Sequence, residues 1–343
     1  MLETKIDRFI LCACCEEVNR YRKDFNHHSS FEYNKNQWTY VVEIMIITIK
    51  SLVPDENKHG SVIDYKRFYE ELKLWYSYRH GENNSLIGCL HNDKKTYWDN
   101  EDDSIFSRIT PIIFANDDWE VARREVLKNI LYTSGSITSI LEGLALSRIF
   151  FVLISNSTIS FDELISYVKE EIVCFSQKEF IDDHSRDIRF SLDTYEGNYS
   201  IEFERKRIEL LNTLNGINIG SRYEILRESL NILGEKEGHT LPGFFFGGLR
   251  GLRTDFEYTS VKDEDFIRNL CGFLAKLRKG RITAESLLVD KYVLPDIFQY
   301  KEGELFFHSL LKKCQVIKKI TEQYKIISFV RTKSGTYRFM RNK

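Results

Sequence analysis

Apolar residues recur at helical spacing along most of this chain, and this periodicity constrains its fold more than any other feature of the sequence. In residues 38–53, the polar side chains Thr39, Glu43 and Lys50 form only a narrow stripe, which is typical of a mostly buried helix. The apolar positions that follow the i, i+3, i+4 pattern are Val41, Ile44, Met45, Ile49 and Leu52. With only 4 prolines and 18 glycines among 343 residues, the chain also has little material for an all-β fold dense in turns. We therefore predict an all-α fold.

Helix start signals locate several further helices. Asp117 and Asp118 are N-cap candidates for a helix over residues 119–132. Ser160 and Glu163 have the spacing of a capping box, in front of a helix that reaches about residue 178. The other helices that periodicity predicts cover residues 137–154, 201–214, 223–233, 242–252, 264–279 and 304–320. Nothing recurs at a fixed period, so the sequence does not indicate a solenoid.

The C-terminal residues differ from the rest in pattern and in charge. Residues 326–330 and 336–340 read as a β-hairpin with its turn at Ser334 and Gly335. Residues 312–343 contain ten Lys or Arg against one acidic residue, Glu322, which leaves the rest of the chain near −11. We therefore predict a helical domain over residues 1–300, followed by a basic extension, helix and hairpin, over residues 301–343.

Three interpretations of the basic extension remain open. It can be a solvated helix and edge hairpin whose lysines discourage aggregation. It can dock on the acidic body of the same chain. It can also be a surface for nucleic acid or an acidic partner, because aromatic side chains alternate with Lys and Arg over residues 312–343. Those aromatic residues are Tyr324, Phe329, Tyr337 and Phe339.

Composition indicates a cytoplasmic protein without a membrane segment. The net charge of −2 excludes a protein whose overall charge drives it onto nucleic acid or an anionic membrane. The first residues include Glu3 and Asp7 and lack a basic leader, so they make a poor signal peptide. The 7 cysteines are interpreted as reduced structural thiols. Cys12, Cys14 and Cys15 have no second Cys or His pair at metal-ligand spacing, so we reject a soft-metal cluster.

Common catalytic motifs are missing from the sequence. It has no glycine-rich phosphate loop after a strand, no nucleophile elbow and no His-Glu-x-x-His helix. Two segments are more informative. One is the Trp38-Thr39 pair at a helix start. The other begins near Glu237 and continues into a helix with glycines at 243, 247, 248 and 251, which let another backbone approach closely.

The order of these motifs resembles that of the ADP-ribosylglycohydrolase superfamily, over roughly residues 5–280. Residues 107–114, Ser-Arg-Ile-Thr-Pro-Ile-Ile-Phe, are similar to the Arg-Ile-x-Pro helix of that family. Trp38-Thr39 resembles the start of its N-terminal metal motif, and the glycine-rich helix after His239-Thr240 resembles its C-terminal motif. The resemblance implies a compact all-α protein with two Mg²⁺ ions in a central cleft, which hydrolyses the glycosidic bond between ADP-ribose and an acceptor.

The sequence departs from the family pattern at the metal ligands. The N-terminal aspartates of the family fall on Tyr40 and Val41. The C-terminal ones fall on Glu237 and His239, and only Thr240 matches. Glu43 lies about 4.5 Å further along its helix than position 40, about twice a Mg–oxygen bond, so a simple replacement fails. The Gly-Asp pair after the first helix is replaced by residues 14–17, Cys-Cys-Glu-Glu.

We therefore expect a divergent ADP-ribosylglycohydrolase-like protein that binds or hydrolyses ADP-ribose-type ligands or ADP-ribosylated proteins, with the standard hydrolase activity lost. No metal site is predicted; Mg²⁺ would require the acidic residues to converge. His239 and Thr240 are expected at a helix N-terminus that recognises an anionic ligand. The full set of ligand-pocket candidates is Glu16, Glu17, Thr39, Glu43, Glu237, His239 and Thr240.

The alternative is a non-enzymatic interaction protein. It would be a partner or immunity factor for an ADP-ribosylating toxin, or a nucleic-acid-associated factor that works through residues 312–343.

Overall fold

The computed structural model describes residues 2–25, 36–55, 60–156, 158–217, 222–235, 243–253, 260–287, 289 and 291–343. These residues are 61% helical and form a mostly helical body followed by a small antiparallel sheet. The helices of the first half are α1 (Leu2–Phe25), α2 (Tyr40–Ser51), α3 (Tyr65–Trp75), α4 (Asn84–His91), α5 (Lys94–Asp99), α6 (Ile105–Ala115) and α7 (Trp119–Thr133). Those of the second half are α8 (Ile137–Ser155), α9 (Phe161–Cys174), α10 (Gln177–His184), α11 (Tyr199–Leu214), α12 (Glu224–Leu233), α13 (Phe244–Arg253) and α14 (Glu264–Arg278).

Most helix predictions are confirmed, including their start signals. Asp118 accepts a hydrogen bond from the Val121 N–H at 3.0 Å and begins α7. Ser160 and Glu163 form the expected capping box at α9. The helix expected to reach about residue 178 is two helices, because α9 ends at Cys174 and Ser176 caps α10.

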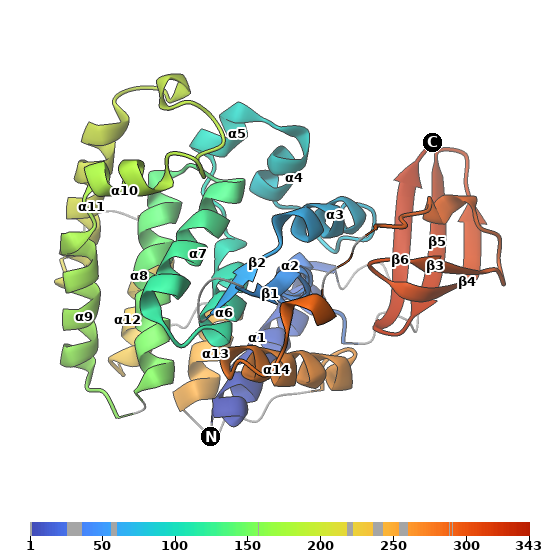
Figure 1. Ribbon diagram of the computed structural model, residues 1–343, viewed down its shortest axis with the longest axis horizontal. Helices are drawn as coiled ribbons and strands as arrows, with labels where there is room; N and C mark the ends of the chain where they lie inside the picture. Colours follow the sequence, from blue (N-terminus) through green and yellow to red (C-terminus); the bar gives the residue numbers. More distant parts are fainter. Residues whose placement is uncertain are drawn as a thin grey trace.

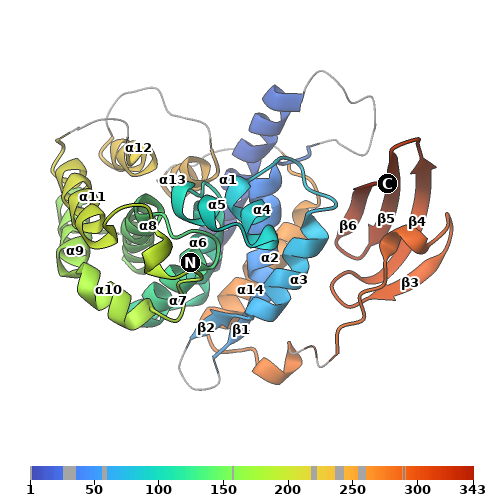
Figure 2. The ribbon, with the colours of Figure 1, turned by 90° about the horizontal axis from the view of Figure 1, so that it is seen from above.

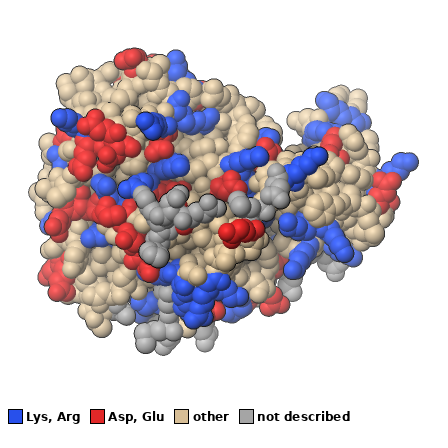
Figure 3. All heavy atoms as spheres, in the orientation of Figure 1, with Lys and Arg blue, Asp and Glu red and all other residues tan. Residues whose placement is uncertain are grey.

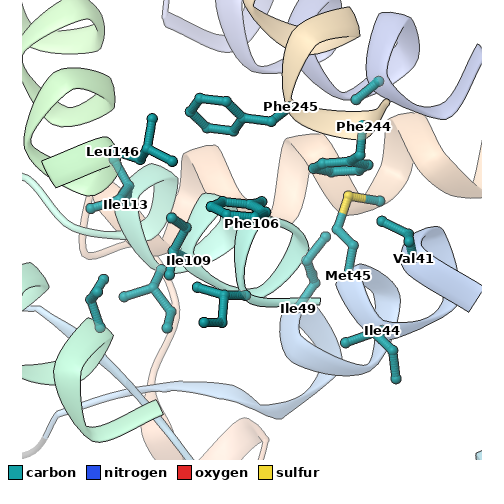
Figure 4. Close-up of a cluster of buried hydrophobic side chains, with 14 of the residues drawn as sticks. Val41, Ile44, Met45, Ile49, Phe106, Ile109, Ile113, Leu146, Phe244 and Phe245 are labelled. Carbon is teal, nitrogen blue, oxygen red and sulfur yellow. The ribbon is translucent and has the colours of Figure 1, made fainter. Parts of the chain in front are cut away.

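Side chains of α2, α6, α8 and α13 form the centre of the hydrophobic core (Figure 4). Every residue of α6 is buried, and so are most residues of α8. α8 is the one described helix that is long and apolar enough to cross a membrane, and 83% of its most apolar stretch is buried inside the protein. Burial of that kind is typical of a core helix. Figures 1 and 2 show α9, α11 and α10 around α8 on one side, and α1 and α14 beside α2 and α6 on the other.

The prediction of a helix over residues 304–320 is wrong. This segment forms β3 (Leu305–His308) and β4 (Lys312–Thr321), which join β5 (Lys325–Thr332) and β6 (Gly335–Asn342) in one sheet of order β3-β4-β5-β6. The β5–β6 hairpin itself is confirmed, with its turn at Ser334 and Gly335. The apolar residues of 304–320 fit the helical period as well as the two-residue period of a strand. Pairing with β5 selects the strand, because it places Cys314 and Val316 on the buried face of the sheet. A short pair, β1 (Leu52–Pro54) and β2 (Ser61–Ile63), was also not predicted.

The sheet stands beside the helical body and touches it through β6 (Figures 1 and 2). The Met340 N–H donates to the Ser77 carbonyl at 2.6 Å, just after α3. The Tyr78 ring packs edge-on against Tyr337 and Phe339, with ring centroids 5.0 and 5.5 Å apart. The basic extension therefore does contact the rest of its own chain, through aromatic rings and through an ion pair of Arg341 with Asp296.

Candidate functional site

Two of the predicted site residues, Glu17 and Thr39, meet at the junction of three helices. Glu17 lies on α1 and is completely buried. Its carboxylate accepts hydrogen bonds from the Thr39 hydroxyl and, at 2.9 Å, from the backbone N–H of Phe244. Thr39 is the N-cap of α2 and Phe244 is the first residue of α13. One carboxylate thus joins the starts of α2 and α13.

The glycines of α13 allow this junction to form. A Cβ atom on Gly247 would lie 2.8 Å from the Cys12 carbonyl, and one on Gly251 would lie 2.7 Å from the Arg8 carbonyl. The Phe9 ring occupies the space beside Gly248, 2.3 Å from an added Cβ. The expectation that these glycines let another backbone approach is therefore confirmed, and that backbone is α1. Close packing of α13 on α1 brings the Phe244 N–H within reach of Glu17.

A second carboxylate, Asp103, lies beside this junction and was not among the predicted residues. The Tyr40 hydroxyl donates to Asp103 Oδ2 at 2.7 Å. Asn83 Nδ2 donates to Asp103 Oδ1 at 2.6 Å and to Asp102 Oδ1 at 3.2 Å. Asn83 caps α4, and the two aspartates precede α6. The one sequence signal for this cluster was the acidic pair just before the Arg-Ile-x-Pro helix.

The surroundings of Glu17 raise its pKa above the usual value. Burial raises the pKa of Glu17, and nearby Asp103 adds to the effect, while the Thr39 hydroxyl and Arg20 oppose it. Arg20 Nη1 lies 3.9 Å from Glu17 Oε1, and its side chain is 39% exposed. Burial and the Asp103 charge likewise raise the pKa of Tyr40. Glu17 therefore has one half-exposed guanidinium nearby, and hydroxyl, amide and backbone groups donate to Glu17 and Asp103.

The other described candidates, Glu16 and Glu43, form contacts away from the Glu17 junction. Glu16 forms an ion pair with Arg250 of α13 at 2.6 Å. Glu43 accepts from Trp75 Nε1 at 2.9 Å and from the His80 N–H at 3.2 Å, and its other oxygen lies 2.6 Å from His80 Nδ1. Convergence of Glu16, Glu17 and Glu43 on one point is therefore not observed.

The remaining candidates, Glu237, His239 and Thr240, lie outside the described residues, so their predicted roles stay predictions. Within the described part of the chain, no group of three or more His, Cys, Asp or Glu side chains is arranged to hold a metal ion. All 7 cysteines are free thiols, and Cys12, Cys14 and Cys15 are buried. Apolar burial raises the pKa of the Cys12 thiol to about 11.

A small hollow lies next to this junction, between the body and the C-terminal hairpin. Its volume is about 30 Å³, room for about one water molecule. Its lining includes Trp38, Glu43, His80, Lys262, Thr336 and Arg338. A larger cavity of about 650 Å³ lies around the C-terminal end of α13, and none of the predicted site residues that the structure describes line it.

Comparison with known proteins assigns neither a family nor a function to this chain. No protein-family model matches the chain, and no curated protein matches its sequence. The ADP-ribosylglycohydrolase resemblance therefore stays a hypothesis that rests on the motifs and on the geometry of the junction.

Proposed function

We propose that this protein is a divergent ADP-ribosylglycohydrolase-like protein that binds an ADP-ribose-type ligand, free or attached to a protein, without a pair of Mg²⁺ ions. Its fold would be the helical ADP-ribosylglycohydrolase type with an added C-terminal sheet. Free cysteines fit a cytoplasmic location, because thiols stay reduced there.

The observation that carries this proposal is the Glu17 junction. The resemblance assigns the ligand cleft to the starts of the two helices that follow Trp38-Thr39 and His239-Thr240. Glu17 accepts hydrogen bonds from Thr39 at the start of α2 and from Phe244 at the start of α13. These two helix starts are far apart in sequence, and their meeting at a buried carboxylate supports a shared cleft.

The hydrogen bonds that Glu17 and Asp103 accept support binding of a ligand rather than metal-assisted hydrolysis. A binuclear Mg²⁺ centre needs several free carboxylate oxygens. Here Glu17 and Asp103 accept hydrogen bonds from protein hydroxyl, amide and backbone groups. Asp103 is exposed and can accept hydrogen bonds from ribose hydroxyls, and the half-exposed Arg20 offers forked N–H donors that suit a diphosphate.

A nucleotide-sized ligand does not fit the 30 Å³ hollow beside Trp38 as it stands. Binding therefore requires the β5–β6 turn, at Ser334 and Gly335, to move away from Lys262 and Asp263. The aromatic contacts of Tyr78 with Tyr337 and Phe339 hold this hairpin in place.

Calorimetric titration with ADP-ribose, with and without Mg²⁺, tests the proposal. We expect binding of the same affinity in both, and about tenfold weaker binding by Arg20→Met, since an ionic hydrogen bond contributes about 1.5–3 kcal/mol. Arg186→Met, an exposed change near α10, is the matched control and leaves the affinity unchanged. Absence of binding, binding that requires Mg²⁺, or Mg²⁺-dependent release of ADP-ribose from a modified protein would each contradict the proposal.

A further inference from the structure

The two faces of the C-terminal sheet differ in how their charges are compensated. Residues directly opposite each other in the register share a face. Tyr337 and Phe339 lie on the inner face, which packs against Tyr78. Two cations of this face have partners: Arg341 forms an ion pair with Asp296 at 2.9 Å, and Lys319 Nζ donates to two backbone carbonyls of residues 298–300.

The outer face combines apolar and basic side chains in successive rows across the strands. Three rows run Leu305–Gln315–Arg331, Lys318–Phe329–Arg338 and Ile320–Ile327–Met340, and Phe307 faces Lys313. Exposure is high at the β3 edge, where Leu305 is 76% and Phe307 is 51% exposed. Tyr324, in the turn between β4 and β5, is 74% exposed. Apolar surface of this kind on a sheet face is a mark of an interaction site.

The outer face has a strong excess of positive charge. By register, Lys313, Lys318, Arg331 and Arg338 lie on this face, and the one acidic residue of 312–343, Glu322, is paired with Lys325 at 3.2 Å. Neither Lys313 nor Arg331 forms an ion pair with any other residue that the structure describes. Figure 3 shows several Lys and Arg side chains gathered on the part of the sheet that lies next to the body. On the side next to the body, the row Lys318–Phe329–Arg338 ends with Arg338, which lines the hollow beside Trp38.

We infer that the outer face of the β3–β6 sheet binds single-stranded nucleic acid. Lys and Arg distributed over β4, β5 and β6 provide contacts for a phosphate backbone. Exposed Phe307, on this face of β3, provides a ring on which an unpaired base stacks, an interaction that duplex bases cannot make. The rest of the chain, residues 1–311, is near −11 in formal charge, so it repels a polyanion and confines it to the sheet. This inference does not depend on ADP-ribose binding.

Fluorescence anisotropy with a labelled single strand of about 20 nucleotides tests the inference on the full chain. We expect the affinity to fall as salt rises from about 50 to 200 mM. The double variant Lys313→Glu with Arg331→Glu should weaken binding at least tenfold and reduce the slope of log K against log salt by about 0.7 for each phosphate that the protein no longer neutralises. The matched control, Lys178→Glu with Arg186→Glu on and after α10, carries the same charge change on the far side of the body and leaves the affinity unchanged.

Stacking is tested separately with Phe307→Ala, which should weaken binding of the single strand about tenfold without changing the salt slope. Lys313, Arg331 and Phe307 are all exposed, so thermal unfolding of these variants should match the wild type. Three results would overturn the inference: salt-independent binding, an equally large decrease in affinity in the control double variant, or competition by polyglutamate as effective as by an oligonucleotide of equal charge. The last result would indicate an acidic protein as the partner, and tighter binding of duplex than of single strand would contradict the stacking interaction.

Discussion

Two buried carboxylates in the helical body, Asp102 and Glu17, have opposite electrostatic surroundings. Asp102 faces Arg108, whose guanidinium donates to Asp102 Oδ2, Ser104 Oγ, Thr133 Oγ1 and Asn129 Oδ1 at 2.8–2.9 Å. Burial alone would raise the pKa of Asp102, but Arg108 and the hydroxyls outweigh it and hold that pKa below its usual value. For Glu17, burial prevails and the pKa is raised.

The difference separates a structural cluster from a candidate functional one. The Asp102–Arg108 pair is charge-neutral and its charged atoms have partners within the fold. Glu17 is buried beside Asp103 and has a raised pKa, and a carboxyl group perturbed in this way is a mark of functional sites. Variants of both clusters test whether the two differ in this way.

The largest effect is expected for Arg108→Met. This change leaves the Asp102 carboxylate buried without its counter-ion, so we expect a decrease of about 3–5 kcal/mol in the free energy of unfolding. Arg20→Met removes a half-exposed guanidinium and should cost less than about 1 kcal/mol. Urea unfolding of the two variants measures the difference. Equal decreases would mean that both clusters are structural.

Gly251→Ala should have the next largest effect, because its Cβ would lie 2.7 Å from the Arg8 carbonyl and 2.8 Å from Cys12 Sγ. We expect a decrease of about 1–3 kcal/mol in stability and a separation of α13 from α1 that weakens the Glu17 junction. Gly272→Ala on α14 is the control, since an added Cβ meets only Glu3 Oε1 at 3.8 Å. That variant should be neutral or slightly more stable in urea unfolding. Equal behaviour of the two variants would contradict the close packing of α13 on α1.

Thr39→Val should reduce stability by about 1 kcal/mol, because it removes both the cap of α2 and a donor to Glu17. Thr39→Ser keeps the hydroxyl and should retain most of the stability. The comparison is made by thermal unfolding at neutral pH. A serine variant as unstable as the valine variant would mean that packing of the threonine methyl group, and not the hydroxyl, is responsible.

The smallest effect is expected in the pH dependence of stability. The raised pKa of Glu17 means that its folded form holds the proton more tightly than the unfolded chain, whose value is 4.5. This contribution is complete below pH 4.5 and is lost as the pH rises through the folded pKa. Glu17→Gln should therefore gain stability relative to the wild type as pH rises from 4.5. Asp102→Asn should behave in the opposite way, because the lowered pKa of Asp102 contributes stability above 3.8 that is lost on acidification. Denaturant midpoints of both variants and the wild type, measured at several pH values, test these two predictions. A stability change in the opposite direction would contradict the prediction for that variant.

Sequence patterns located many helices correctly but only part of the site. Glu17 and Thr39 were among the predicted residues, and the structure brings them together. Asp103 and Asn83 were missed, because each is an ordinary loop or N-cap residue in the sequence and gains its meaning from a contact with another segment. Glu43 was selected for its place in α2, but the side chains of Trp75 and His80 hold its carboxylate away from the junction.

Local sequence alone determined most helices, their caps and the final hairpin, because these depend on contacts within a few residues along the chain. It also determined that the glycines of residues 243–251 required a closely packed partner. Tertiary structure decided that the partner was α1, that residues 305–308 and 312–321 became strands, and that one carboxylate joined two helix starts more than two hundred positions apart in the sequence. These outcomes depend on pairing and burial between distant segments, and no local pattern encodes which segments will meet.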